Sequence, residues 1–167
     1  MTNKKFYTGI GSRQTPPNVC LLMTKLALVL YKFNYILRSG HAEGADMAFE
    51  NGASEKADIY LPWKLFNNSN SNLYVITPKS LDIAKQIHPA WNKCSQYAKL
   101  LHARNVYQIL GNDVKTLSDF VICWTPNAKI VGGTATAINL AKQHNIPVFN
   151  LADVHIQNKI LEYVECF

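Results

Sequence analysis

The sequence contains few cysteines, and they are far apart. They are Cys20, Cys94, Cys123 and Cys166, and no two of them form a C-x-x-C pair. This spacing matches neither the common zinc-binding patterns nor a redox dithiol. No group of Cys, His, Asp or Glu has metal-ligand spacing and no serine stands in a nucleophile elbow, so the sequence predicts no metal and no cofactor. Because Cys20 and Cys123 lie in apolar stretches, we expect both in the core.

Charged residues are also scarce, at 17% of the chain, and no run of five or more basic residues occurs. The 17 Lys and Arg outnumber the 11 Asp and Glu, which gives a formal net charge of +6. An excess of positive charge favours anionic partners, including nucleotides and nucleic acids. Because this charge is spread along the chain, we expect a diffuse positive surface. A nucleic-acid partner therefore stays open but is not favoured.

Long apolar runs are absent as well. The longest, residues 19–33, is interrupted by Thr24, Lys25 and Lys32 and is too short to span a bilayer. The N-terminal segment has no apolar region of the kind found in signal peptides. We therefore expect a cytoplasmic protein without a membrane partner.

What the sequence does contain is an alternation of short apolar strands and amphipathic helices. Strands are predicted at 6–9, 35–38, 59–63, 119–124 and 146–151, and residues 73–77 form either a further strand or an edge excursion. Helices are predicted at 19–33, 45–56, 80–86, 89–111 (as two pieces), 134–144 and 154–164. The alternation indicates an α/β, Rossmann-like three-layer sandwich with a mostly parallel central sheet, in one domain over 1–167.

Three glycine-bearing loops follow predicted strands, at 9–13, 39–46 and 131–136. The carboxyl ends of parallel strands share one edge of the sheet, so we expect the loops to meet there. Glycine lets backbone N–H groups approach an anion, and a following helix start adds partial positive charge. We predict a pocket for a phosphate-bearing nucleotide or derivative. Its predicted ligand-binding residues are Gly9, Gly11, Ser12, Arg13, Ser39, Gly40, His41, Gly44, Asp46, Gly132, Gly133, Thr134 and Thr136.

Each loop also has a purely structural interpretation. The first can be a simple turn that leaves Arg13 in solvent, and Asp46 can brace its own loop. A threonine N-cap explains Thr134 or Thr136, but not the two glycines before them. Glu50 lies one turn after Asp46 and faces the same edge if its helix begins near Gly44.

Three further residues are candidates for the pocket. Trp124 ends a predicted strand, where it can stack on a base or be a buried aromatic. Arg104 and Asn105 lie in an apolar helical stretch, where a charged side chain needs a partner. They either form a structural network or reach over the pocket, and we favour the pocket.

With these residues laid out, the chain resembles the SLOG superfamily. This group of Rossmann-like proteins includes DNA-processing protein A (Smf) and the LOG-type cytokinin-activating phosphoribohydrolases. The resemblance rests on Gly9-Ile10-Gly11-Ser12-Arg13, on Ser39-Gly40-x-Ala42-x-Gly44-Ala45-Asp46, and on strand 119–124 leading to Gly132-Gly133-Thr134. The chain looks most like the compact DprA-like proteins of bacteriophage genomes, which also have motifs similar to Arg104-Asn105 and Ile109-Leu110-Gly111.

The resemblance also bears on catalysis. The LOG motif Pro-Gly-Gly-x-Gly-Thr-x-x-Glu supplies a glutamate for cleavage of an N-glycosidic bond, and Asn139 stands at the position of that glutamate here. An amide has no ionisable carboxylate for acid–base work. The LOG reaction would therefore need another carboxylate, and the candidates are Glu43, Glu50 and Asp46. We lean towards a protein that is not an enzyme.

Three functions follow from this comparison. The first is capture of a nucleotide-derived signal, ADP-ribose-like or cyclic, as related SLOG domains do in bacterial antiviral systems; a phage protein of this kind would act as an anti-defence sponge. The second is a LOG-like nucleotide N-glycosidase, and the third is single-stranded DNA binding in recombination. Because proteins of this superfamily usually self-associate, we also expect a homo-oligomer.

Overall fold

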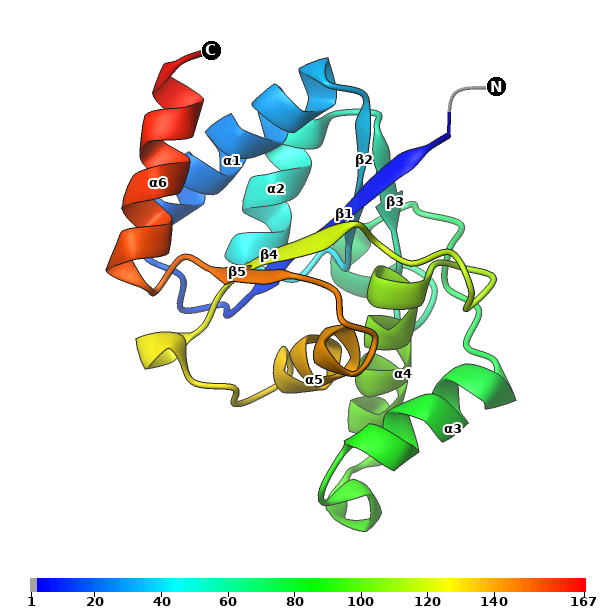
Figure 1. Cartoon of the computed structure of the whole chain (residues 1–167). Coiled ribbons are helices and arrows are strands. Elements are labelled where there is room, and N and C mark those ends of the chain that lie inside the picture. The colour runs from blue at the N-terminus through cyan, green and yellow to red at the C-terminus, as the bar shows by residue number, and fades with distance from the viewer. Residues whose placement is uncertain (1–2) are drawn as a thin grey trace.

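A computed structural model describes residues 3–167 (Figure 1). Its elements are β1 (Lys5–Gly11), α1 (Pro17–Lys32), β2 (Tyr35–Ser39), α2 (Ala45–Ala53), β3 (Ala57–Ile59), η1 (Phe66–Asn68), α3 (Pro78–Ile87), η2 (Trp91–Lys93), α4 (Gln96–Leu110), β4 (Phe120–Trp124), η3 (Pro126–Ala128), α5 (Ala135–Gln143), β5 (Val148–Asn150) and α6 (Val154–Glu165). Within the described residues, no helix is both long enough and apolar enough to cross a membrane.

The five strands form one parallel sheet in the order β3-β2-β1-β4-β5. This is the order of a Rossmann-like sheet, in which the chain leaves β1 towards one side and later returns to its other side. β1 and β4 are the central pair, with Gly9 opposite Ile122 and Gly11 opposite Trp124. The ligand-binding crevice of such a sheet lies at the carboxyl ends of these two strands. The predicted α/β class is confirmed.

Helices cover both faces of the sheet (Figure 1). α1, α2 and α6 pack on one face over a core that includes Tyr7, Leu37 and Phe49. α3, α4 and α5 pack on the other face over a second core that includes Val121 and Ile138. Successive residues of β4 point to opposite faces, so Val121 and Cys123 join one core while Ile122 joins the other.

The boundaries of several helices have clear local causes. Pro17 opens α1, where the missing backbone N–H costs nothing because the first turn has no partner for it. α2 ends at Ala53 because Ser54 takes a positive φ of 52°, which stops the predicted helix three residues early. The stretch predicted as two helical pieces over 89–111 is η2 followed by α4, and the Ser95 hydroxyl caps α4 by accepting from the Ala98 N–H at 3.2 Å.

One strand prediction is wrong, and one core prediction holds only in part. The third strand lies at Ala57–Ile59, because its pairing with β2 covers only these residues and Pro62 follows. Of the two alternatives for residues 73–77, the edge excursion fits, because among the described residues this segment pairs only through an isolated parallel bridge from Leu73 to Tyr60. Cys20 is half-buried and its thiol contacts the Thr15 carbonyl, whereas Cys123 is buried as predicted.

Candidate functional site

The three glycine loops meet at the carboxyl edge of the sheet. The Ser12 N–H in the first loop donates to the Trp124 carbonyl at the end of β4, with 3.0 Å between N and O. In the second loop, Gly44 has a φ of +84°, and a Cβ there would lie 2.7 Å from the Ser12 carbonyl oxygen. Glycine is required at this position both for its φ and for the close approach of the first loop.

A cavity of about 820 Å³ lies between the loops and α4. All three loops contribute to its wall, together with residues of α4. The predicted residues that line it are Gly11, Ser12, Arg13, Asp46, Arg104, Asn105, Gly132, Gly133 and Thr134. The structure thus brings segments that are up to about 120 positions apart in the sequence to one concave site.

The other predicted residues do not line this cavity. Gly9 packs against the Phe49 ring, and the Ser39 hydroxyl donates to the Gly9 carbonyl at 2.6 Å. Gly40 lies against the side chains of Arg104 and Gln108. Glycine is needed at these two positions because neighbouring side chains pack closely against the backbone, so packing explains them without a ligand.

His41, Glu50, Trp124 and Thr136 also lie outside the cavity wall. His41 Nδ1 and Glu50 Oε2 are 2.8 Å apart, and the pair is partly buried. Trp124 packs against the core beneath α1, α2 and α6, so it is not placed to stack on a base in the cavity. The Thr136 hydroxyl lies 2.8 Å from His102 Nδ1 instead of facing the cavity.

Arg104 is the centre of a buried network that connects the second and third loops. Its Nη1 donates to the carbonyls of Gly40 (2.6 Å) and Tyr60 (3.2 Å), and its Nε donates to Asn105 Oδ1 (3.0 Å). The Asn105 amide then donates to the Gly133 carbonyl at 2.7 Å. Both alternatives considered from the sequence therefore apply, because Arg104 is part of a network and also lines the cavity. Its Nη2 makes no hydrogen bond to residues 3–167.

Asp46 is the buried carboxylate of the cavity wall. One oxygen accepts from the Gly40 N–H at 3.0 Å. Burial raises the pKa of Asp46 to about 6, while Arg104 and the N–H groups of Gly40 and Ala42 oppose that shift. Burial also raises the pKa of Glu50, against the opposing effect of His41. These interactions make Asp46 a brace of the second loop.

The third loop is open. Gly132 has a φ of +69°, and a Cβ added to Gly132 or Gly133 would meet no atom of residues 3–167 within 4 Å. α5 begins just after this loop, and no side chain in the described part of the chain caps its first turn. Unpaired N–H groups at a helix start carry partial positive charge and bind anions well. Arg13 adds a full positive charge nearby, is exposed, and makes no ion pair within the described residues.

Sequence reasoning missed several residues of the cavity wall. Phe66, Gln108 and Thr125 line it, although none belongs to a glycine loop. Phe66 comes just before the polar segment 67–72, whose Asn and Ser residues are typical of a surface loop. An aromatic residue at the start of a polar loop was the one available signal. Phe66, and not Trp124, is the aromatic side chain available to a base.

Asn139 belongs to a neighbouring cavity of about 440 Å³. Val131 and Gly132 line both cavities, so the third loop separates them. The position that the LOG motif fills with a glutamate therefore lies on the far side of this loop from the main cavity.

The comparisons with known proteins support the fold. Models of known protein families and curated protein sequences gave no match. Among solved structures, the chain is similar to DNA processing protein A from Helicobacter pylori, whose structure is described for its single-stranded DNA binding mode. The TM-score is 0.58 at 20% sequence identity, over 98% of this chain and 82% of the other. The chain has a DprA-like fold.

Proposed function

We propose that the cavity binds the phosphate end of a nucleotide-derived small molecule. The observation that carries this proposal is the convergence of three separate loop backbones with Arg13 and Arg104 on one cavity at the carboxyl edge of a parallel sheet. Gly133 is the sharpest detail, because no protein atom would obstruct a side chain there. An open backbone beside an uncapped helix start suits close approach by a phosphate.

The size and lining of the cavity fit a ligand larger than phosphate alone. Small-molecule sites usually measure about 300–1,000 Å³, and this cavity measures about 820 Å³. Phe66 and Leu101 supply apolar wall for a base or ribose, and Gln108 and Thr125 supply hydrogen-bonding groups. The sequence resemblance to SLOG proteins points to ADP-ribose-like molecules and cyclic nucleotides as the first ligands to test.

We further propose that the ligand is held and not cleaved. Asn139 provides no carboxylate and lies in the neighbouring cavity. Asp46 provides one, but it is buried and already accepts hydrogen bonds from the backbone N–H groups of its own loop. A protein that retains such a ligand would lower its free concentration, which is the chemistry of a sponge for an immune signal.

The test is calorimetry of the full chain with ADP-ribose, a cyclic dinucleotide and AMP. Arg13→Gln should weaken binding about tenfold or more, because it removes a charge-assisted hydrogen bond to phosphate. Lys32→Gln is the matched control, since Lys32 is an exposed cation at the far end of α1 and should leave affinity unchanged. Binding of none of the three nucleotides, or equal binding by Arg13→Gln, would contradict the proposal. Chromatography of the same samples tests whether the bound nucleotide stays intact. Release of free base would show that the protein is an N-glycosidase.

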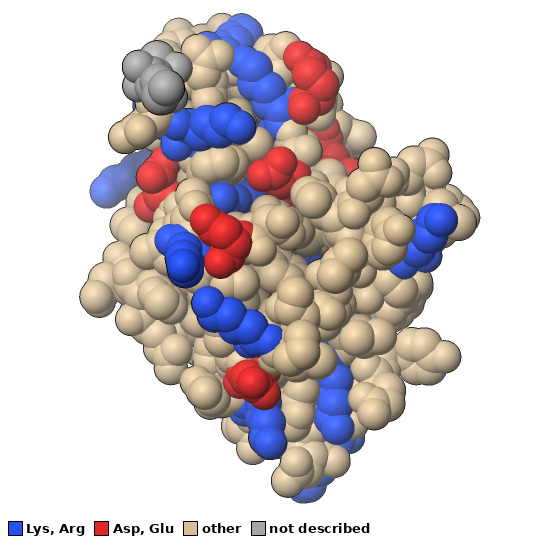
Figure 2. Space-filling model, turned by 90° about the vertical axis from the view of Figure 1, so that its right-hand side faces the viewer, with Lys and Arg blue, Asp and Glu red and all other residues tan. Residues whose placement is uncertain are grey.

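Single-stranded DNA is the second candidate ligand, and the DprA-like fold favours it. On the face that Figure 2 shows, Lys and Arg side chains lie among Asp and Glu and do not form a continuous stripe, so this face gives no support to DNA binding. A fluorescence-polarisation titration with a labelled oligonucleotide separates the two. DNA binding should weaken steeply as salt rises, because each phosphate contact releases counterions. Tight, salt-dependent DNA binding without nucleotide binding would replace our first proposal.

A further inference from the structure

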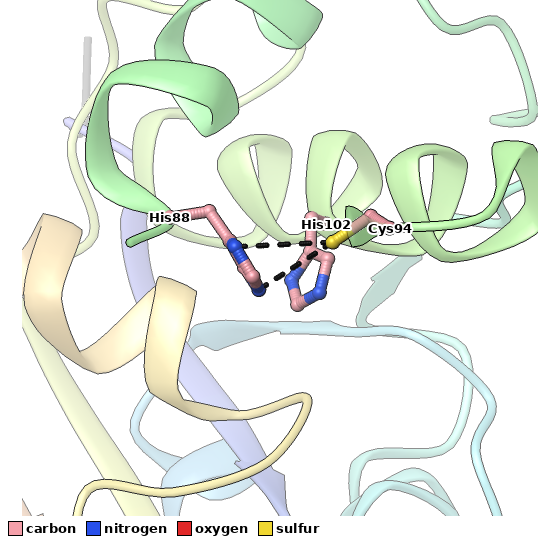
Figure 3. Close-up of side chains that lie close together, drawn as sticks. All are labelled: His88, Cys94 and His102. Atoms are coloured by element: carbon pink, nitrogen blue, oxygen red, sulfur yellow. Dashed lines mark hydrogen bonds between the residues drawn. The ribbon is translucent and has the colours of Figure 1, made fainter. Parts of the chain in front are cut away.

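Three potential metal ligands come together on the face of the molecule that carries α3, α4 and α5. His88 follows the end of α3, Cys94 follows η2, and His102 lies in α4 (Figure 3). One ligand atom from each residue can be chosen so that all three lie within 4.8 Å of one another. The chain folds back on itself between α3 and α4, and this turn brings residues 88, 94 and 102 together.

We propose that His88, Cys94 and His102 bind one zinc ion. The proposal is independent of the nucleotide site, since none of the three residues lines the main cavity. Two imidazoles and a thiolate are ligands that Zn²⁺ accepts readily, whereas Mg²⁺ and Ca²⁺ require oxygen ligands. Three protein ligands with a free fourth position are typical of zinc sites that hold a water or an outside ligand.

Cys94 and His88 are spaced almost as such a site requires, and a ligand atom of His102 lies within 4.8 Å of both. Cys94 Sγ lies 3.7 Å from His88 Nε2 and 3.8 Å from His88 Nδ1. Tetrahedral zinc with bonds of about 2.0–2.3 Å places its ligand atoms about 3.3–3.6 Å apart. The two imidazole rings are also adjacent, with 4.4 Å between their centroids. His88 Nδ1 accepts from the Ala90 N–H at 3.1 Å. Coordination by neutral His88 gives up this hydrogen bond, because Nδ1 then either binds the metal or carries the ring proton.

One ring nitrogen of His102 has a hydrogen-bonding neighbour in α5. Its Nδ1 lies 2.8 Å from the Thr136 hydroxyl, and in the tautomer whose Nδ1–H donates to this hydroxyl, Nε2 is the nitrogen for coordination. Metal-binding histidines commonly use their second nitrogen in such a hydrogen bond, which fixes the ring.

The fourth position of the ion would face usable space. His88 and His102 line the smaller cavity of about 440 Å³, together with Asn139 and Thr136. A water or an anionic group can enter there, and the third glycine loop forms the opposite wall. Asn139 lines the same cavity as His88 and His102, so it would share this cavity with the metal ion. Its place in the LOG-like motif did not predict this.

Cobalt(II) replaces zinc as a visible probe in the test. We expect metal-free full-length protein to bind one Co²⁺ per chain, with a thiolate-to-cobalt charge-transfer band and the visible bands of four-coordinate cobalt, and Zn²⁺ should abolish both. Cys94→Ser should lose the charge-transfer band and bind at least about 100-fold more weakly, since losing even an outer-shell partner costs 10- to 100-fold. Cys166→Ser is the matched control, because Cys166 is an exposed free cysteine at the end of α6, and it should behave as the wild type.

Two more variants keep the test decisive if Cys94→Ser does not fold. His88→Gln retains the thiol and should weaken Co²⁺ binding while shifting the visible bands. Thr136→Val keeps the size of the side chain but removes the hydroxyl next to His102, and should weaken binding about 10- to 100-fold with the charge-transfer band retained. A wild-type protein without the band, or a Cys94→Ser protein that keeps it, would overturn the proposal. No nucleotide is present in any arm, so this result cannot be confused with failure of the nucleotide site.

Discussion

The first and third glycine loops lie on the same edge of the sheet, but their glycines face opposite surroundings. A Cβ on Gly9 would lie 2.5 Å from the Phe49 ring and 2.8 Å from Leu37, both in the core. A Cβ on Gly133 would meet no atom within 4 Å. The same residue type thus serves packing in one loop and open access in the other, and only the second kind indicates a ligand.

The largest expected effect comes from the packed side of this comparison. Gly9→Ala forces a methyl group into the Phe49 ring, and both neighbours are fully buried and cannot move aside. We expect the free energy of unfolding to fall by about 3 kcal/mol, because overpacking a core costs about 1–3 kcal/mol and here two contacts are violated. The midpoint of thermal unfolding should fall by about 10 °C for a chain of this size. If Gly9→Ala unfolds at the same temperature as the wild type, the distinction between a packed glycine in the first loop and an open one in the third is wrong.

The second loop is packed too, and its buried acid should make stability depend on pH. Asp46 has a pKa of about 6 in the folded protein against 3.8 for the ordinary group. Between these values the folded state binds more protons than the unfolded state, so this group lowers stability as pH rises from about 4 to about 6. The full effect is at most about 3 kcal/mol, since one pKa unit corresponds to about 1.4 kcal/mol.

Asp46→Asn should remove this dependence. Urea unfolding at intervals from pH 4 to pH 7 measures the unfolding free energy of the wild type and of the variant. As pH rises, the unfolding free energy of the wild type should fall relative to that of Asp46→Asn. The exposed Asp82→Asn controls for loss of one surface carboxylate. A difference that stays constant across this range would show that Asp46 titrates normally and is not desolvated.

The order of the strands along the chain and the shared edge of the three loops could be predicted from the sequence, because short local stretches of the chain determine them. Strand 119–124 and the three strand–loop–helix junctions are set by short apolar runs and nearby glycines, so their order and their shared edge follow without knowledge of the fold. The position of Arg104 in an apolar helix likewise indicated that it needs partners. The structure supplies those partners in Gly40, Tyr60 and Asn105.

The remaining features depend on packing between distant segments. Nothing near Gly9 in the sequence shows that Phe49 will lie over it, and nothing near Gly133 shows that its surroundings will be empty. The group His88, Cys94 and His102 was missed for a related reason, since it forms only when the turn between α3 and α4 brings the three side chains together. Trp124 packs against the core, whereas Phe66 lines the cavity. The layers of the fold decide which aromatic side chain faces the cavity, and the local sequence does not show this.

The smallest expected effect on stability, and the sharpest test of the open side, is Gly133→Ala. The free protein has room for the methyl group, and the φ of Gly133 is not in the left-handed region, so stability should stay equal or rise by up to about 1 kcal/mol as the unfolded chain loses freedom. Affinity for the nucleotide should fall about tenfold, or about 1.4 kcal/mol, because the methyl group occupies the space that a phosphate needs beside the backbone. Thermal unfolding and calorimetry on the same preparation measure both quantities. Opposite signs for stability and affinity are expected only if this glycine is kept free for a ligand, whereas unchanged affinity would show that the third loop is merely flexible.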